Sequence, residues 1–99
     1  MNKAWKYEER TVAKMFNTTR KLMGGTDEKC DIDDPLFAVD TKLRQTWSVE
    51  KWFEELQSYA RKHDKIPILV LRKPGKKRRL AVMDMGSLVD ILKGKGLIQ

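Results

Sequence analysis

The stretch Pro35-Leu36-Phe37-Ala38-Val39-Asp40-Thr41-Lys42-Leu43-Arg44 decides which fold the chain can form, because it is predicted to be the central β-strand. Side chains alternate between the two faces of a strand. The first face is then mostly apolar: Phe37, Val39, Thr41 and Leu43. The second face is mostly polar: Ala38, Asp40, Lys42 and Arg44. The alternation therefore predicts one face that packs in the core and one that carries chemistry.

The polar face offers a carboxylate and an ammonium two residues apart, Asp40 and Lys42, with Asp31 just upstream. Asp31 lies inside a predicted strand, where aspartate is disfavoured, so a functional role is a better explanation for it. Asp33 and Asp34 come just before a proline, which is common turn chemistry. Asp31 is therefore the better candidate ligand. Carboxylate oxygens suit a hard divalent cation. These residues predict a site for such a cation and a water beside it. The alternative for Asp40 and Lys42 is an exposed ion pair worth at most about 1 kcal/mol.

The composition limits the class of protein. The 99-residue chain has a net charge of +7, which favours an anionic partner such as nucleic acid, although many small proteins are basic for solubility alone. Residues 1–99 fit a single domain. The single cysteine, Cys30, excludes an intramolecular disulfide and a cysteine-based zinc site. No apolar run approaches the ~20 residues that span a bilayer. We expect a cytoplasmic protein, in the host cytoplasm if viral, with no membrane partner.

The predicted elements follow the order helix, three short strands, helix, two strands, helix. Helices are expected over residues 3–16, 48–63 and 85–93, and the strands include residues 21–23, 35–44, 66–71 and 79–83. Residues 66–71 are continuously apolar, which is typical of a strand covered on both faces. The helix over residues 48–63 carries a broad apolar stripe: Val49, Trp52, Phe53, Leu56, Tyr59 and Ala60. This order predicts an α/β (α+β) fold with a mixed sheet of about five strands and helices packed on it.

Two adjacent glutamates lie on the first predicted helix. On a helical wheel Glu9 falls between Ala13 and Phe16, on the packed side, whereas Glu8 lies on the other flank. A buried carboxylate is costly unless a metal or a cationic partner compensates it. Glu9 is therefore the preferred candidate, with Glu8 left open. A solvated pair of glutamates on a charged helix is an equally good interpretation of this sequence.

A basic turn connects the last two predicted strands. It gathers five cations at one hairpin tip: Lys73, Lys76, Lys77, Arg78 and Arg79. Such a cluster suits phosphates, and three cations elsewhere are further candidates for phosphate contacts: Arg20, Lys21 and Arg44. A solvated hairpin that resists aggregation is the alternative.

Four segments carry a resemblance to a known family: Trp5-Lys6-Tyr7-Glu8-Glu9-Arg10, Asp31-Ile32 before Pro35, Phe37-Ala38-Val39-Asp40-Thr41-Lys42, and Lys65-Ile66-Pro67-Ile68-Leu69-Val70. In this order and spacing, from Trp5 to about Leu92, the chain resembles small phage-type Holliday junction resolvase-like proteins of the PD-(D/E)XK nuclease superfamily. The resemblance implies a restriction-endonuclease-like core. It also implies a metal site of Asp31, Asp40 and Glu9, with Lys42 as the motif lysine. Asp40 stands where glutamate is usual, and its side chain is one methylene shorter.

The resemblance implies a DNA endonuclease that uses Mg²⁺ or Mn²⁺ and cleaves branched DNA such as a Holliday junction. We expect a homodimer, because symmetric cutting of two strands calls for two active sites. Two other classes of function stay open. One is a catalytically silent DNA-binding module with the nuclease fold. The other is a protein-interaction domain that uses the Trp52-Phe53 region.

Overall fold

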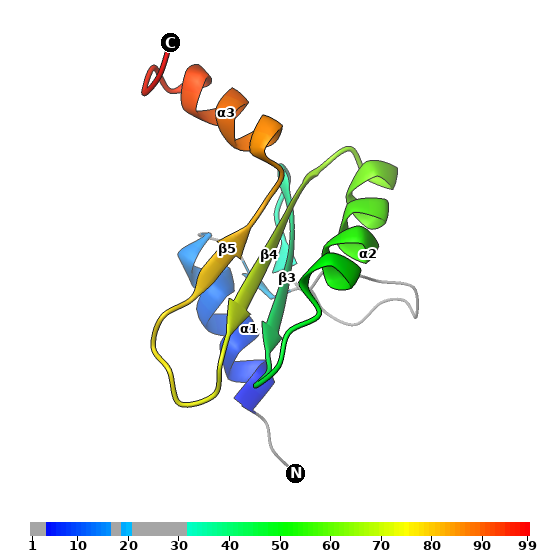
Figure 1. The fold of residues 1–99 in the computed structure, drawn as a ribbon, viewed down its shortest axis with the longest axis vertical. Helices are drawn as coiled ribbons and strands as arrows, with labels where there is room; N and C mark the ends of the chain where they lie inside the picture. The colour runs from blue at the N-terminus through cyan, green and yellow to red at the C-terminus, as the bar shows by residue number, and fades with distance from the viewer. Residues whose placement is uncertain (1–3, 17–18, 21–31) are drawn as a thin grey trace.

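The computed structural model describes residues 4–16, 19–20 and 32–99, with the backbone alone at residues 19, 20 and 33. The elements in chain order are α1 (Ala4–Met15), β1 (Thr19–Arg20), β2 (Ile32–Asp33), β3 (Phe37–Leu43), α2 (Val49–Lys62), β4 (Ile66–Arg72), β5 (Leu80–Val82) and α3 (Met85–Gly94) (Figure 1). The strands form one sheet in the order β1-β2-β3-β4-β5. The pair β3–β4 is parallel and the other pairs are antiparallel. This confirms the mixed α/β class.

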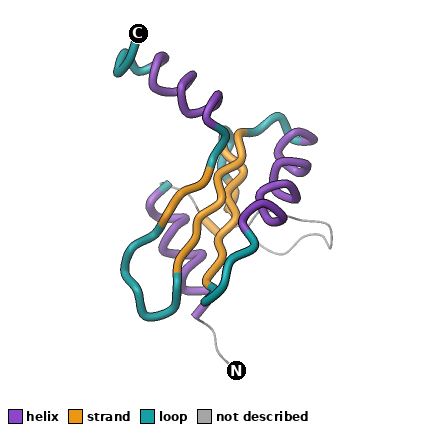
Figure 2. Tube along the Cα trace, in the orientation of Figure 1, coloured by secondary structure: helices purple, strands orange, loops and turns teal. Residues whose placement is uncertain are grey.

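Strands β3 and β4 form the centre of the sheet, and α2 connects them. Parallel neighbours need a long crossover connection, for which a helix is the usual solution. The helix α2 lies on one face of the sheet and α1 on the other (Figure 2). Within the described residues, β1 and β2 contain two residues each. The sheet is therefore most extensive where the two parallel strands meet.

Each face of the sheet has its own hydrophobic core. On the α2 side the core contains Ala38, Leu56, Tyr59, Ala60, Leu69 and Leu71. On the α1 side it contains Val12, Ala13, Ile32, Val39, Ile68 and Val70. The apolar stripe predicted for α2 and the doubly covered strand predicted for residues 66–71 are both confirmed. The prediction of a single core face on the central strand is wrong, because α2 buries Ala38 on the face expected to carry only chemistry.

Local turn chemistry sets both hairpins. The Asp34 carboxylate accepts hydrogen bonds from the backbone N–H groups of Leu36 and Phe37, both at 2.9 Å, and so turns the chain from β2 into β3 as expected for Asp before proline. After β4 the backbone N–H of Lys76 donates to the Lys73 carbonyl. Gly75 lies between them with a φ of 80° after Pro74, which is the arrangement of a type II turn.

Two segments differ from the prediction or extend it. Residues 19–20 form β1, a strand that the sequence analysis did not predict, and the predicted strand over residues 21–23 lies outside the described residues. Helix α3 forms, with its N-terminus capped by the Asp84 side chain, which accepts from the backbone N–H of Ser87. It contains no buried residue and projects from the sheet (Figure 1), so its apolar residues Leu88, Ile91 and Leu92 belong to neither buried core. Among the described helices none is long and apolar enough to cross a bilayer.

Candidate active site and basic hairpin

A cavity of about 280 Å³ lies between the start of α1 and the second half of β3. Its lining residues are Trp5, Glu8, Glu9, Asp40, Thr41, Lys42, Leu43 and Arg44. The fold thus brings together three residues singled out from the sequence as one site: Glu9, Asp40 and Lys42. The fourth, Asp31, lies outside the described residues; it precedes Ile32, which pairs with Val39 next to Asp40.

Strand β3 contributes an unbroken run of residues to the cavity. Within the described residues, β2 pairs with Ala38 and Val39, and the cavity lining begins at the next residue, Asp40, and continues to Arg44. Because successive side chains of a strand point to opposite faces, residues from both faces of β3 border the cavity.

Asp40 and Lys42 lie on the same face of β3 as Ala38 and form a close pair. Lys42 Nζ lies 3.2 Å from Asp40 Oδ2 and 5.5 Å from the ring centroid of Trp52 on α2. Asp40 is only 8% exposed, so the pair differs from the solvated ion pair considered as the alternative. A carboxylate this buried needs a cation or strong hydrogen bonds to offset its lost hydration. The ammonium of Lys42 supplies part of that compensation.

Glu9 lies on the packed side of α1, as the helical wheel predicted, and is 7% exposed. Within the described residues, no three acidic, histidine or cysteine side chains gather as a metal-ligand set. Mg²⁺ keeps several of its waters and is commonly held through one or two carboxylates. Glu9 and Asp40, two buried carboxylates on one small cavity, fit that requirement chemically.

Glu8 has a different role from its neighbour. Its Oε2 accepts from Arg79 Nε, and its Oε1 accepts from Arg79 Nη2 and Arg72 Nη1, each at 2.8 Å. Burial raises the pKa of the Glu8 carboxyl, but the hydrogen bonds and positive charges of Arg79 and Arg72 outweigh it and hold the pKa below its usual value. Glu8 is therefore an ionised anchor that ties α1 to β4 and the basic hairpin.

The same arginines fix the hairpin. Arg72 also donates through Nε to the carbonyl of Lys76, so one guanidinium links Glu8 to the turn. Arg79, predicted to contact phosphate, directs its guanidinium to Glu8 instead of to open solvent. Sequence reasoning did not find Arg72 as a functional residue. Its place on β4, two residues after Val70 on the α1 face, is the pattern that could have indicated it.

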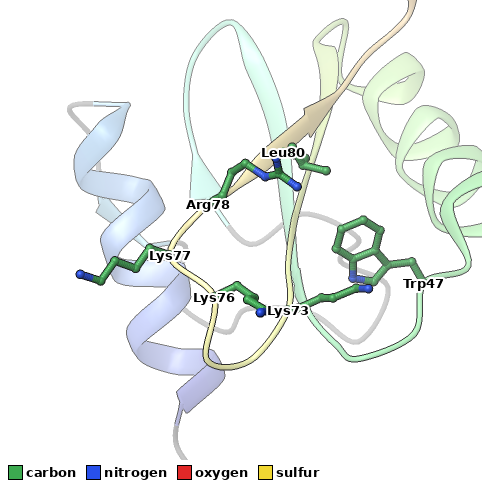
Figure 3. Close-up of a pocket in the computed structure, with 6 residues that line it drawn as sticks. All are labelled: Trp47, Lys73, Lys76, Lys77, Arg78 and Leu80. Carbon is green, nitrogen blue, oxygen red and sulfur yellow. The ribbon is translucent and has the colours of Figure 1, made fainter.

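The remaining hairpin cations surround an open hollow of about 530 Å³ beside the loop before α2. Figure 3 shows the residues that line it: Trp47, Lys73, Lys76, Lys77, Arg78 and Leu80. The indole Nε1–H of Trp47 donates to the Arg44 carbonyl at 3.0 Å, and Lys73 Nζ lies 5.5 Å from the Trp47 ring centroid. The four cations predicted at the turn, apart from Arg79, thus line one hollow together with Trp47, an aromatic residue that the sequence analysis did not single out.

The cavity and the hollow lie at the same end of the sheet, where the parallel strands finish. Leu43 pairs with Arg72, and the backbone N–H of Arg44 donates to the Arg72 carbonyl just beyond the two strands. Ligands of open α/β sheets characteristically bind outside the carboxyl ends of the strands. Of the other predicted phosphate contacts, Arg20 belongs to β1 at the opposite edge from β5, and Lys21 lies outside the described residues.

No family model, curated protein or solved structure matches this chain. What the site can do therefore follows from its own residues and geometry.

Proposed function

We propose that the protein is a metal-dependent DNA endonuclease with a restriction-endonuclease-like core. One observation carries the proposal: Glu9, Asp40 and Lys42 come from distant parts of the sequence, yet line a single small cavity. Glu9 and Asp40 are both buried carboxylates, 7% and 8% exposed, and carboxylate oxygens are suitable ligands for a hard divalent cation. The sheet of five strands, with α1 and α2 on opposite faces, supports the proposed core.

The proposed chemistry is hydrolysis of a phosphodiester. Glu9 and Asp40, together with Asp31, are the residues proposed to hold Mg²⁺ or Mn²⁺. The bound cation would supply charge stabilisation at the phosphate and lower the pKa of an attacking water. Lys42, whose Nζ lies 3.2 Å from Asp40 Oδ2, is the residue proposed to orient that water and to stabilise the negative charge that develops on the phosphate.

The proposed substrate is DNA, with branched DNA such as a four-way junction favoured. The hairpin cations at the same end of the sheet support binding of a phosphate backbone near the cavity. A homodimer is part of the proposal, because symmetric cutting of two strands calls for two copies of the site.

Cleavage of a labelled four-way junction in Mg²⁺ and in Mn²⁺ tests the proposal, with linear duplex and single strand alongside. Asp31→Asn, Asp40→Asn and Lys42→Met should each abolish cutting while circular dichroism shows an intact fold. Asp90→Asn, an exposed aspartate on α3, is the matched control and should cut like the parent. Parent-like cutting by the three cavity variants would place the active site elsewhere.

A catalytically silent DNA-binding module is the second candidate. The observation that favours it is the 3.2 Å contact between Lys42 and Asp40, which already neutralises the central carboxylate without a metal. DNA binding that is independent of divalent cations, with no cleavage of any of the three substrates, would decide for this function.

A further inference from the structure

We propose that the hollow beside Trp47 binds an unpaired nucleotide of a DNA strand. The base would stack on the Trp47 indole, and the flanking phosphates would contact Lys73, Lys76 and Arg78. The assignment rests on the proposed function in one respect, namely that the ligand is DNA; it does not depend on cleavage. It adds a single-stranded segment to the DNA features that the protein would recognise.

Trp47 is held in a way that leaves its ring available. The indole N–H is satisfied by the Arg44 carbonyl, so the one polar atom of the side chain needs no further partner. One part of the half-buried ring packs against the core on the α2 side, and another part lines the hollow. A tryptophan fixed from behind, with its hydrogen bond made, offers a flat apolar surface at a low entropic cost to a ligand.

The surroundings of the ring are cationic on one side and apolar on another. The six lining residues comprise four cations, Trp47 and Leu80, and include no carboxylate. Leu80 is 37% exposed and supplies an apolar wall, while Lys73 already lies over the ring at a distance typical of a cation–π contact. Stacking on an aromatic side chain beside a basic track is the arrangement by which proteins hold single strands.

The size of the hollow favours a single nucleotide. Its volume of about 530 Å³ falls within the usual range of small-ligand pockets, roughly 300–1,000 Å³. A base inside a continuous duplex has both faces covered by its neighbours, so only an unpaired or extruded base can present a face to Trp47. The hollow should therefore discriminate single-stranded segments from duplex, whereas exposed lysines alone would not.

The hairpin is held in place from the other side of the sheet. Arg72 joins Glu8 to the Lys76 carbonyl, and Arg79 joins Glu8 to the start of β5. These contacts fix the turn that carries Lys73, Lys76 and Arg78 beside Trp47. Figure 3 shows Lys77 pointing away from Trp47, so Lys77→Ala is a matched control that removes an equal charge from the same turn.

Binding is measured in EDTA, where no metal-dependent cleavage can occur, with a labelled thymidine oligonucleotide as the single strand and a blunt duplex of equal length. The parent should prefer the single strand. Trp47→Leu should weaken single-strand binding about tenfold, the usual effect of losing one stacked base, and leave duplex binding unchanged. Trp47→Phe should retain most of the affinity, and Lys73→Ala should weaken single-strand binding more than Lys77→Ala does.

Intrinsic fluorescence gives a readout that a merely structural role would not move. Stacking should quench Trp47, and the quench should vanish in Trp47→Phe, which keeps an aromatic ring in the core and retains only Trp5 and Trp52 as emitters. Circular dichroism checks folding, and if Trp47→Leu fails to fold, the Phe variant and Lys73→Ala still test the site. Equal affinity of the parent for both DNAs, or no loss of quench in Trp47→Phe, would overturn the inference.

The two proposals fail separately. If no substrate is cut but Trp47-dependent binding of the single strand persists, the endonuclease proposal fails and the nucleotide site stands. If the junction is cut as expected and Trp47→Leu binds single strands like the parent, the nucleotide site fails alone.

Discussion

The cavity lined by β3 and the hollow beside Trp47 lie at the same end of the sheet, but carboxylate side chains are buried in the first and cationic side chains are exposed in the second. In the cavity Glu8 and Asp40 are nearly inaccessible, and each is held by a cation at 3.2 Å or less. In the hollow the lining lysines and Arg78 are exposed. Buried charges need partners at fixed positions, whereas exposed cations attract phosphates over about a Debye length and are screened by salt. The difference in burial is therefore the basis for proposing a small cation as the ligand of the cavity and a polyanion as the ligand of the hollow.

The adjacent residues Glu8 and Glu9 are also proposed to have different roles. Glu8 and Glu9 are both buried on α1, but Glu8 is bound to the two arginines that position the hairpin. Glu9 is the glutamate proposed to act in the cavity. The choice of Glu9 over Glu8 in the proposed site therefore rests on the arginine partners of Glu8, which a helical wheel does not show.

Substitution of these two glutamates should give the largest difference in the rate of DNA cleavage. Glu9→Gln should lower the rate of DNA cleavage roughly a hundredfold or more, because it removes a charge proposed to hold the metal. Glu8→Gln, assayed well below its unfolding temperature, should cut at close to the parent rate. Metal-dependent cleavage of a labelled junction measures both, and the reverse pattern would make Glu8 the acid of the site.

Glu8→Gln, which should leave the cleavage rate nearly unchanged, should instead lower the stability of the protein. Glu8→Gln leaves Arg72 and Arg79 without their carboxylate and should lower the free energy of unfolding by about 3 kcal/mol, as for other buried pairs that lose one partner. Urea unfolding followed by circular dichroism measures the change. Glu54→Gln, an exposed glutamate on α2, is the control and should stay within about 0.5 kcal/mol of the parent. Equal midpoints for the two variants would show that the arginine pair contributes nothing.

Lowering the pH should remove the difference in stability between the parent and Glu8→Gln. Burial raises the pKa of Glu8, but Arg79 and Arg72 lower it further than burial raises it, so the unfolded chain binds this proton more tightly. The stabilisation is therefore complete above the unfolded value of 4.5 and is lost as the pH falls through the lower folded value. Urea midpoints of the two proteins should differ most at neutral pH and converge on acidification below 4.5. A constant gap would contradict this origin of the pair's strength.

The basic hairpin should determine part of the salt dependence of DNA binding. Lys76→Ala and Lys77→Ala should each reduce by about one the slope of log affinity for duplex DNA against log salt concentration, since each phosphate contact releases about one counterion. Lys93→Ala on α3 removes the same charge away from the hairpin and should leave the slope unaltered. Fluorescence anisotropy titrations over a range of salt concentrations measure it. Unchanged slopes in the hairpin variants would remove the hairpin from the DNA-binding surface.

The smallest effect concerns the turn that carries the cations. Gly75 has a φ of 80° with open space where a Cβ would lie, so Gly75→Ala should cost about 1 kcal/mol from backbone strain alone. Gly94, the last residue of α3, also has open space around it but no positive φ, and Gly94→Ala should not destabilise the protein. Thermal unfolding of the two variants compares them. A larger loss of stability in Gly94→Ala than in Gly75→Ala would contradict the role of Gly75 in the turn conformation.

Local patterns in the sequence were enough to predict much of the architecture. The continuous apolar run before Arg72 indicates a strand covered on both faces, and the three- and four-residue spacing in α2 indicates its packed stripe, because both depend only on neighbours along the chain. Asp34 before a proline predicts the turn into β3 for the same reason. The pairing of Asp40 with Lys42 on one face of a strand also follows from local alternation.

Contacts between residues far apart in sequence could not be predicted from local patterns. Glu8 meets Arg72 and Arg79 across 64 and 71 positions, and no periodicity encodes that contact. Trp47 meets the basic hairpin only because β3 and β4 are parallel and finish together. Alternation along β3 placed Ala38 on a polar face, and the returning α2 buried it. The sequence by itself determined which segments form strands and helices and which charges they carry. The register between distant segments determined which of those charges are neutralised inside the protein and which are left to meet a ligand.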